Sequence, residues 1–400
     1  MKFQPGVGMR SLLQNPMDAA RDAAEEAKKN AGGLARFGII LASSKYDQQK
    51  IAHDVHVALG GAPTIGCSAA GIITNAGVQE DAVAVLAFGG DAGSFYPVRV
   101  DGISKDMRQA GQTFARKLKE AGRGGEMKGA LMFSDALSGN GTELIRGVLS
   151  EMGETFMLAG GAAGDDMQFK KTFQYFNGEA INDAAVGVGV AGDIVFSSAA
   201  GHGWRPIGAP HTVSKANGTT LMEIDGRPAF SLYQEYFDEK ADDFKQALTL
   251  SAVTYPLGMK TGGSEEWMIR VPLAVNQDGS IVCGAEVIEG SEIRLMIGTI
   301  DTSLEAAERA AKTVVAILPS TGEKSVMFIS DCVARKILFG HKKEQEIDLL
   351  RSIAGPTVEL FGFYSYGQIA PLPQPPKDIN TCDPGFYEQS ISLTVLAERQ

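Results

Sequence analysis

The sequence has few cysteines, and none of them are paired. Cys67, Cys283, Cys332 and Cys382 lie far apart, and no two of them form a CxxC pair. A disulfide framework or a cysteine zinc site would need closer spacing. The sequence therefore predicts a protein of a reducing compartment, which we take to be the cytoplasm.

The sequence also lacks long apolar segments and an excess of basic residues. No stretch approaches the ~18 apolar residues that could span a bilayer, and the N-terminus lacks the apolar core of a secretory signal. With 37 Lys and Arg against 48 Asp and Glu, the net charge is −11. This charge repels nucleic-acid phosphates and anionic lipids. We expect neither nucleic-acid binding nor membrane insertion.

The composition is that of a globular protein rich in glycine. Hydrophobic residues make up 44% and charged residues 21% of the chain. The 400 residues suffice for two to three domains of roughly 150 residues each. Glycine accounts for 48 of 400 residues, or 12%, against roughly 7% in typical proteins. This excess indicates many turns or close backbone approaches.

Apolar runs with strand character alternate with amphipathic helices, which predicts an α/β protein with mixed α+β sheets. Residues 1–30 are predicted to form an N-terminal helical extension, because Asn15 and Pro16 are typical of a helix start. Two further parts follow, at 31–225 and 226–400. They are divided where EIDGRPAF passes into a polar helical stretch.

Three stretches share a strand–helix–strand–turn–strand pattern. The first strands end at Ser43-Ser44, Ser134-Asp135 and Ser330-Asp331, and the turns are GCSAAG (66–71), AGGAAG (159–164) and GFYSYG (362–367). In each turn a small residue is followed five positions later by glycine, which lets backbone or a ligand approach closely. We interpret the pattern as internal duplication, and we expect a ligand pocket where the turns converge.

Two glycine motifs resemble nucleotide-binding sequences only in part. GVGVAG, with Gly187, Gly189 and Gly192, is followed by the strand-like DIVFSS and not by a helix, so we predict a tight hairpin. GCSAAGII has the glycine spacing of a P-loop, but Ile72 and Ile73 replace the residues that would hold phosphate and Mg²⁺. Neither motif predicts nucleotide binding.

Cys67, Asp165 and Asp166 are the candidates for catalysis. Cys67 lies in a turn, where it could be an exposed nucleophile or a small residue that fits the turn. The two aspartates could be an acid/base pair, a cation site or a solvated turn. A Cys- or Asp-dependent hydrolase is therefore an alternative function.

His202 is the candidate metal ligand among five histidines. Gly201 and Gly203 leave space beside its imidazole, while Trp204 and Arg205 offer a flat apolar face and a carboxylate-binding guanidinium. We treat it as the candidate haem ligand, with a hydrogen-bonded structural role as the alternative. The other histidines are predicted to lie at the surface or in a strand: His53, His56, His211 and His341.

Several motifs together resemble the FIST (F-box and intracellular signal transduction) family. They are GCSAAGII, LAGGAAGDD with TFQYFNGE after it, GWRPIGAPHTVSKANG leading into EIDGRPA, and then YPLG, NQDGSIVCGAEVIEGSEI and FGFYSYGQIAP. The resemblance runs from about residue 30 to nearly the end. It implies a FIST N part over 31–225 and a FIST C part over 226–400, which sense a small ligand in signal transduction.

The resemblance also implies a cofactor and a partner. A subset of the family resembles haem-binding, nitric-oxide-sensing proteins that regulate histidine kinases. Because the two parts take up nearly all of the chain, we expect a non-enzymatic sensor that acts on a separate output protein. Such a sensor works because its ligand binds one conformation better than another. A haem-based nitric oxide sensor and an interaction module without a ligand are further alternatives.

The sequence departs from the family pattern at two positions. Ile72 and Gln368 stand where the family usually has Glu, so we expect a ligand less charged than the amino acids proposed for the family. The candidate ligand-binding residues are Gly66, Cys67, Ser68, Gly71, Gly160, Gly161, Asp165, Arg205, Tyr364, Tyr366 and Gln368.

Overall fold

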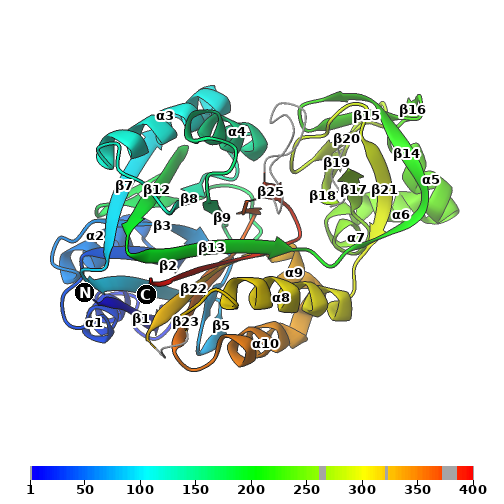
Figure 1. The fold of residues 1–400 in the computed structure, drawn as a ribbon. Helices are drawn as coiled ribbons and strands as arrows, with labels where there is room; N and C mark the ends of the chain where they lie inside the picture. The colour runs from blue at the N-terminus through cyan, green and yellow to red at the C-terminus, as the bar shows by residue number, and fades with distance from the viewer. Residues whose placement is uncertain (1, 261–266, 320–322, 372–384, 400) are drawn as a thin grey trace.

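The computed structural model describes residues 2–260, 267–319, 323–371 and 385–399. It shows a body of mixed sheets and helices, on the left in Figure 1, and a smaller inserted domain on the right. The predicted α/β class with mixed sheets is confirmed. None of the helices in the described ranges is long and apolar enough to cross a bilayer.

The body consists of three repeats of one unit, in which three strands and two helices alternate, a short hairpin follows, and a last strand ends the unit. The first repeat comprises β1 (Phe3–Ser11), α1 (Ala19–Asn30), β2 (Phe37–Ser43), α2 (Gln48–Ala58), β3 (Thr64–Ala69), β4 (Ile72–Thr74), β5 (Gly77–Gln79) and β6 (Ala82–Gly90). The second comprises β7 (Gly93–Asp101), α3 (Met107–Ala121), β8 (Gly129–Ser134), α4 (Gly141–Met152), β9 (Leu158–Ala162), β10 (Gln174–Phe176), β11 (Glu179–Ile181) and β12 (Ala184–Gly192).

The third repeat is interrupted after its first strand and carries one extra helix. It comprises β13 (Ile194–Gly201), α8 (Ile300–Val315), β22 (Ser325–Cys332), α9 (Val333–Phe339), α10 (Glu344–Ala354), β23 (Val358–Ser365), β24 (Gly367–Ile369), β25 (Phe386–Tyr387) and β26 (Ile391–Glu398). The duplication predicted from the sequence is therefore confirmed, and each repeat is longer than the sequence pattern indicated.

Each repeat forms a six-stranded sheet in which four strands are its own and two, a short hairpin, come from another repeat. The strand orders are β1-β6-β2-β3-β10-β11, β7-β12-β8-β9-β24-β25 and β13-β26-β22-β23-β4-β5. The exchange is cyclic: the second repeat contributes its hairpin to the sheet of the first, the third contributes to the second, and the first contributes to the third. In every sheet the two central strands are parallel and joined by a helical crossover.

The inner faces of the three sheets enclose one apolar core. Phe133 of the second repeat packs edge-on against Phe328 and Phe363 of the third, with ring centroids 5.7 and 5.8 Å apart. The outer faces are covered by α1 and α2, by α3 and α4, and by α8 and α10. Strands buried on both faces need nearly continuous apolar runs, which explains sequences such as FGIILAS and AVAVLAF.

Two local predictions were wrong. Residues 1–30 are not only helical, because β1 pairs with β6 along its whole length before α1 begins. The strand was not predicted because Gly6 and Gly8 interrupt its apolar pattern. In the structure both glycines allow α1 to pack directly on the backbone of β1. The hairpin expected at GVGVAG is absent from the described structure as well: β12 pairs with β7 and β8, whereas β13 pairs with β26.

Residues 205–260 and 267–297 form the inserted domain, between β13 and α8. Its elements are β14 (Arg205–Asn217), β15 (Thr220–Ile224), β16 (Arg227–Pro228), α5 (Ser231–Phe237), α6 (Ala241–Gln246), α7 (Leu248–Thr254), β17 (Leu257–Lys260), β18 (Met268–Arg270), β19 (Pro272–Val275), β20 (Ile281–Cys283) and β21 (Glu292–Ile297). They enclose a separate apolar core. The predicted division between residues 225 and 226 falls in the turn between β15 and β16, inside this domain.

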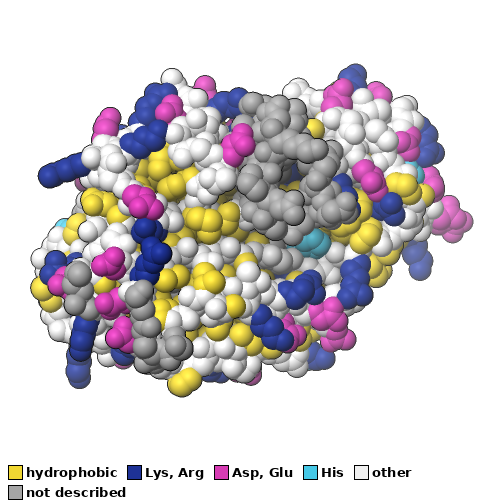
Figure 2. All heavy atoms as spheres, in the orientation of Figure 1, with side chains coloured by type: hydrophobic (Ala, Val, Ile, Leu, Met, Phe, Trp, Pro, Cys, Tyr) yellow, Lys and Arg dark blue, Asp and Glu magenta, His cyan; other side chains and the backbone are white. Residues whose placement is uncertain are grey.

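The surface carries charges of both signs. On the face shown in Figure 2, Lys and Arg side chains are interspersed with Asp and Glu. The basic residues of α3 follow this pattern, because Arg108 and Arg116 form ion pairs with Glu143 and Glu151 of α4. The basic residues of this helix therefore form local ion pairs with the neighbouring helix and not a continuous basic patch.

Candidate functional site

The three glycine-containing turns meet at one place in the body. The amide of Gly164 donates to the carbonyl of Ser68 (3.0 Å), and the amide of Ala70 donates to the carbonyl of Tyr364 (3.0 Å). The amide of Tyr366 donates to the carbonyl of Ala162 (3.1 Å), which closes a ring of three hydrogen bonds. Residues almost 300 positions apart in the chain are therefore neighbours.

Glycine is required where each turn's strand lies against its parallel neighbour. A Cβ atom on Gly66, Gly160 or Gly362 would lie 1.9, 2.0 or 2.2 Å from a carbonyl oxygen of the facing strand. These three glycines are equivalent, which places Asp165 at the position of Gly71 and Gly367. The predicted alignment of the second turn, on residues 159–164, is therefore displaced by one residue.

Several predicted ligand-binding residues are buried and already hydrogen-bonded. The Ser68 hydroxyl donates to the carbonyl of Gly164 (2.8 Å) and accepts from the amide of Phe173 (3.0 Å). Gln368 donates to the hydroxyl of Ser365 and accepts from Ser390. Gly161 faces Ser330 and Phe363 so closely that a side chain would not fit. These residues fix the turns, and their polar atoms are not free for a ligand.

Cys67 lies in β3 with no exposed surface, and burial raises the pKa of its thiol well above the ordinary value. A buried neutral thiol is a poor nucleophile. Ile72, one of the departures from the family pattern, is buried in the same core. Neither this side chain nor that of Gln368 lines a pocket described below, so the expectation of a less charged ligand gains no support from their positions.

Asp165 holds the segment that follows the second turn. Its carboxylate accepts from the amides of Phe169 (2.8 Å), Lys170 (2.7 Å) and Lys171 (2.9 Å). It also accepts from the hydroxyl of Tyr366, which in turn accepts from the amide of Met167. Asp165 and Tyr366 were both predicted as site residues, and the structure brings them together as a clamp on the loop.

The clamped loop has a strained backbone. Asp166, Met167 and Phe169 have φ angles of 55°, 65° and 50°, in the left-handed region that side chains other than glycine rarely adopt. The Phe169 ring is 48% exposed and stacks on Tyr366, with centroids 4.6 Å apart. Strain of this kind costs of order 1–3 kcal/mol per residue and gathers at ligand sites.

An open pocket of about 400 Å³ lies under this loop, and we call it the axial pocket. Its lining comes from all three repeats: Lys45, Ala70, Glu80, Asp166, Met167, Gln168, Val333, Lys336, Ile337, Gly340 and Lys343. Lys45 follows β2, Ala70 follows β3, Asp166 follows β9 and Val333 follows β22. The pocket thus lies at the carboxyl ends of the parallel strands, where α/β proteins bind ligands.

Charges of both signs face the axial pocket. Lys336 and Lys343 lie 3.3 and 2.7 Å from the Glu80 carboxylate, and mainly Lys343 lowers the pKa of Glu80 to about 2. Asp166 accepts from the hydroxyls of Ser43 and Ser44 at 3.3 and 3.2 Å. Burial raises its pKa, although Lys45 and Lys336 act in the opposite direction.

Arg205 and His202 lie elsewhere, at the boundary between the body and the inserted domain. They line a second cavity of about 270 Å³, which we call the junction pocket. Its lining is Ala200, Gly201, His202, Gly203, Trp204, Arg205, Trp267, Thr302, Glu305, Ala306, Arg309 and Tyr387. The predicted ligand-binding residues therefore belong to two places.

The geometry of His202 does not fit an axial haem ligand. Its Nδ1 atom accepts from the amide of Trp204 (2.9 Å), and the ring also hydrogen-bonds the backbone of Trp267. Burial, followed by the charges of Arg335 and Arg309, lowers its pKa to about 4. Both nitrogens of the neutral ring are in use, so iron ligation would require breaking a hydrogen bond. His202 instead joins the crossover to the inserted domain.

The other histidines form no metal site. Nδ1 of His211 lies 2.7 Å from the carboxylate of Asp225. His53 and His341 are exposed, as predicted, whereas His56 is partly buried and packs beside Gly178. Within the described ranges no three His, Cys, Asp or Glu side chains are grouped so that they could hold a metal ion.

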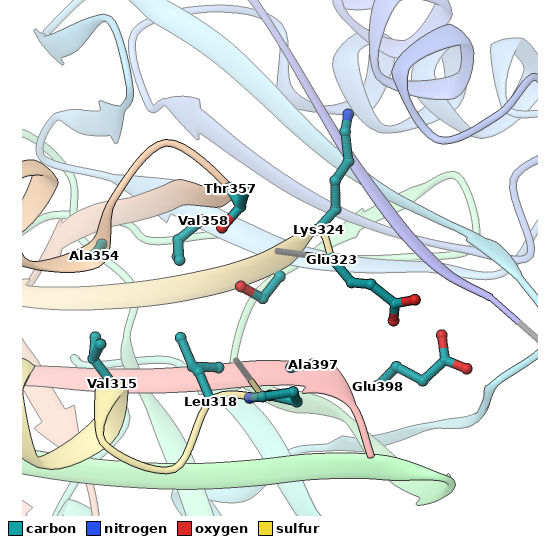
Figure 3. A pocket seen from close by; sticks show the side chains of 11 residues that line it. Val315, Leu318, Glu323, Lys324, Ala354, Thr357, Val358, Ala397 and Glu398 are labelled. Carbon is teal, nitrogen blue, oxygen red and sulfur yellow. The ribbon is translucent and has the colours of Figure 1, made fainter. Parts of the chain in front are cut away.

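A third pocket lies at the opposite end of the third sheet (Figure 3). Val315, Leu318 and Val358 form its apolar side, and the carboxylates of Glu323 and Glu398 lie at the other side. It is formed where β22 and β23 begin, which is the end of parallel strands that rarely binds ligands. We therefore do not assign it to the functional site.

A buried charge cluster that the sequence analysis missed lies beside the axial pocket. Arg335 on α9 has no exposed surface and lies 3.0 Å from Asp331, and it also pairs with Glu346 of α10. The same guanidinium donates to the carbonyls of His202 (2.7 Å) and Ser303 (3.1 Å). One cation with two carboxylates leaves excess negative charge, and burial raises the pKa of Asp331. In the sequence, the four-residue spacing of Asp331 and Arg335 is the feature that could have indicated this ion pair.

Comparisons with known proteins give the family. The model of the FIST N domain matches residues 36–227, and that of the FIST C domain matches residues 229–371. The meeting point of the two matches lies inside the inserted domain. FIST domains are associated with signal transduction and the sensing of small ligands.

Similar sequences come from an archaeon and a bacterium. Uncharacterized protein MJ1623 of Methanocaldococcus jannaschii is 27% identical over 399 residues, covering 90% of this chain and 75% of that protein. Uncharacterized protein Rv0628c of Mycobacterium tuberculosis is 23% identical over 378 residues, covering 92% and 94%. Among solved structures, a cyanuric acid hydrolase from A. caulinodans aligns over 100% of both chains at 6% identity, with a TM-score of 0.41.

Proposed function

We propose that this chain, which belongs to the FIST family, is a sensory protein that binds a small polar ligand in the axial pocket without chemical turnover. One observation carries the proposal: the only described loop with several left-handed non-glycine residues lies over a pocket formed by all three repeats. The volume of about 400 Å³ falls within the roughly 300–1,000 Å³ typical of ligand pockets. The charges on its walls favour a polar ligand.

Helix α9 offers a route from the pocket to the rest of the molecule. Val333, Lys336 and Ile337 line the axial pocket. On the same helix, Ala334 and Leu338 belong to apolar clusters with Val253 and Met296 of the inserted domain. A ligand that favours one position of α9 would therefore shift the inserted domain as well. The recipient of the signal would be a separate protein, for which the family resemblance suggests a histidine kinase.

A thermal-shift screen with amino acids, dicarboxylates and neutral metabolites tests the proposal. We expect one class to raise the melting temperature, and the shift to disappear in Asp166→Asn and Lys336→Gln. Lys312→Gln, an exposed lysine away from the pocket, is the matched control. A shift that survives both pocket substitutions would place the ligand elsewhere and refute the proposal.

A further inference from the structure

The junction pocket lies where the chain passes between the body and the inserted domain. Its walls come from the crossover 200–205, from α8 and from Trp267 of the inserted domain. Tyr387 adds a wall from the third repeat. A molecule bound there would contact both parts of the protein at once.

The walls are aromatic and the floor is made of small residues. Trp204 and Trp267 are the two tryptophans of the chain, and both line this pocket. Gly201, Gly203 and Ala306 line the rest of the pocket and carry little or no side chain. Gly203 packs directly on the first turn of α8, where a side chain would collide with Ser303. A flat apolar group fits such a space.

The surroundings carry positive charge. Arg205 and Arg309 approach the pocket from the crossover and from α8, and Arg205 pairs with Glu305 at 2.7 Å. Arg309 has no carboxylate within ion-pair distance among the residues that the structure describes. The Nζ of Lys260 and the guanidinium of Arg294 lie 4.9 and 5.6 Å from the centroid of the Trp267 ring, and Arg294 also pairs with Glu292 at 2.7 Å.

We propose that the junction pocket is a second binding site, which takes a small aromatic carboxylate with its ring against the tryptophans and its carboxylate on Arg309. The volume of about 270 Å³ restricts the ligand to a compact molecule. Guanidinium groups bind carboxylates with paired, charge-assisted hydrogen bonds, so an anion is preferred over a neutral or cationic analogue. This inference does not depend on the function proposed for the axial pocket.

Tryptophan fluorescence of the full chain tests the proposal directly, because both emitting side chains lie at the site. Benzoate and phenylacetate are titrated, with benzyl alcohol and benzylamine as analogues that lack the negative charge. We expect a saturable change with the two carboxylates and at least about tenfold weaker binding of the two analogues. Equal responses to benzoate and benzyl alcohol, or no saturable response to either carboxylate, would overturn the proposal.

The substitution Arg309→Gln distinguishes a specific carboxylate site from nonspecific binding of aromatic compounds. The residue is exposed on α8, so the substitution leaves the helix intact. We expect it to weaken benzoate binding by about tenfold, whereas Lys312→Gln, one turn further along α8, leaves the titration unchanged. Identical midpoints in the two variants would show that Arg309 does not receive the carboxylate and would refute the assignment.

Discussion

The carboxylate of Asp165 in the second repeat accepts a hydrogen bond from the hydroxyl of Tyr366 in the third. This contact joins two repeats at the point where the three turns converge. The same hydroxyl accepts from the amide of Met167 at 2.7 Å. Two side chains thus hold the strained loop over the axial pocket, and the loop's shape depends on their pairing.

Tyr366→Phe should destabilise the protein by about 1–3 kcal/mol, because it leaves the amide of Met167 without its partner and removes one donor from Asp165. Urea denaturation measures the loss. Tyr96→Phe is the control, since Tyr96 is also partly buried but its hydroxyl makes no hydrogen bond to the described part of the chain. An equal effect of both substitutions would contradict the clamp.

Arg335→Met should destabilise the protein by about 3–5 kcal/mol, because two buried carboxylates lose their cation. The guanidinium also holds the carbonyls of His202 and Ser303, which would lose their donors. Lys312→Gln removes only an exposed ion pair and should cost less than about 1 kcal/mol. If Arg335→Met unfolds no more easily than Lys312→Gln, the cluster does not stabilise the body.

Gly160→Ala should cost about 3 kcal/mol or more, because its Cβ atom would lie 2.0 Å from the carbonyl oxygen of Met132. Relief requires β8 and β9 to separate, since the obstacle is backbone. Gly125→Ala is the matched control at an exposed turn, with 3.2 Å to the nearest atom. Comparable melting temperatures for the two variants would show that the strands can shift freely.

The described cysteines should resist alkylation in the folded protein. Cys67, Cys283 and Cys332 are buried, and burial raises the pKa of each thiol, to about 11 for Cys332. In a Cys382→Ser background, iodoacetamide should label all three only after denaturation, as mass spectrometry would show. Rapid labelling of Cys67 at neutral pH would restore it as a candidate nucleophile.

His202 should make stability depend on pH below neutrality. Its folded pKa of about 4 lies below the ordinary 6.5, so the unfolded chain binds the proton more readily. The contribution is therefore fully present above pH 6.5 and is lost as the pH falls toward 4, by about 2 kcal/mol between pH 7.5 and 5.

His202→Asn, which keeps an acceptor near the amide of Trp204, should flatten this part of the stability profile. His53→Asn, at an exposed position on α2, serves as the control and should leave the profile unchanged. Denaturant unfolding at several pH values gives the comparison. A slope that persists in His202→Asn would assign the pH dependence to other groups.

The strands were largely predictable, because burial on both faces requires continuous apolar runs. FGIILAS, GALMFS and SVMFISDC all form the expected strands. Strand β1 was missed because two glycines interrupt its apolar pattern. These glycines allow α1 to pack closely on the strand, and a local sequence pattern does not show which helix will pack there. The exchange of hairpins was equally invisible, because β4, β10 and β24 have three residues each and pair with strands far away in sequence.

Part of the candidate site was also visible in the sequence. The turns converge as expected and Asp165 meets Tyr366, but the pocket is lined by Lys45, Asp166 and Lys336, which no spacing singled out as a group. Their positions depend on where loops and α9 lie after folding.

By itself, the sequence determined the α/β class, the threefold internal repetition and the family, because these follow from local apolar patterns and from motifs in a fixed order. Only the tertiary structure decided which turn residues are buried in the core and which side chains face a pocket. Burial and charge proximity arise from contacts between repeats. Arg205 and Gly66 were therefore grouped in one predicted site, although folding places them at two different ones.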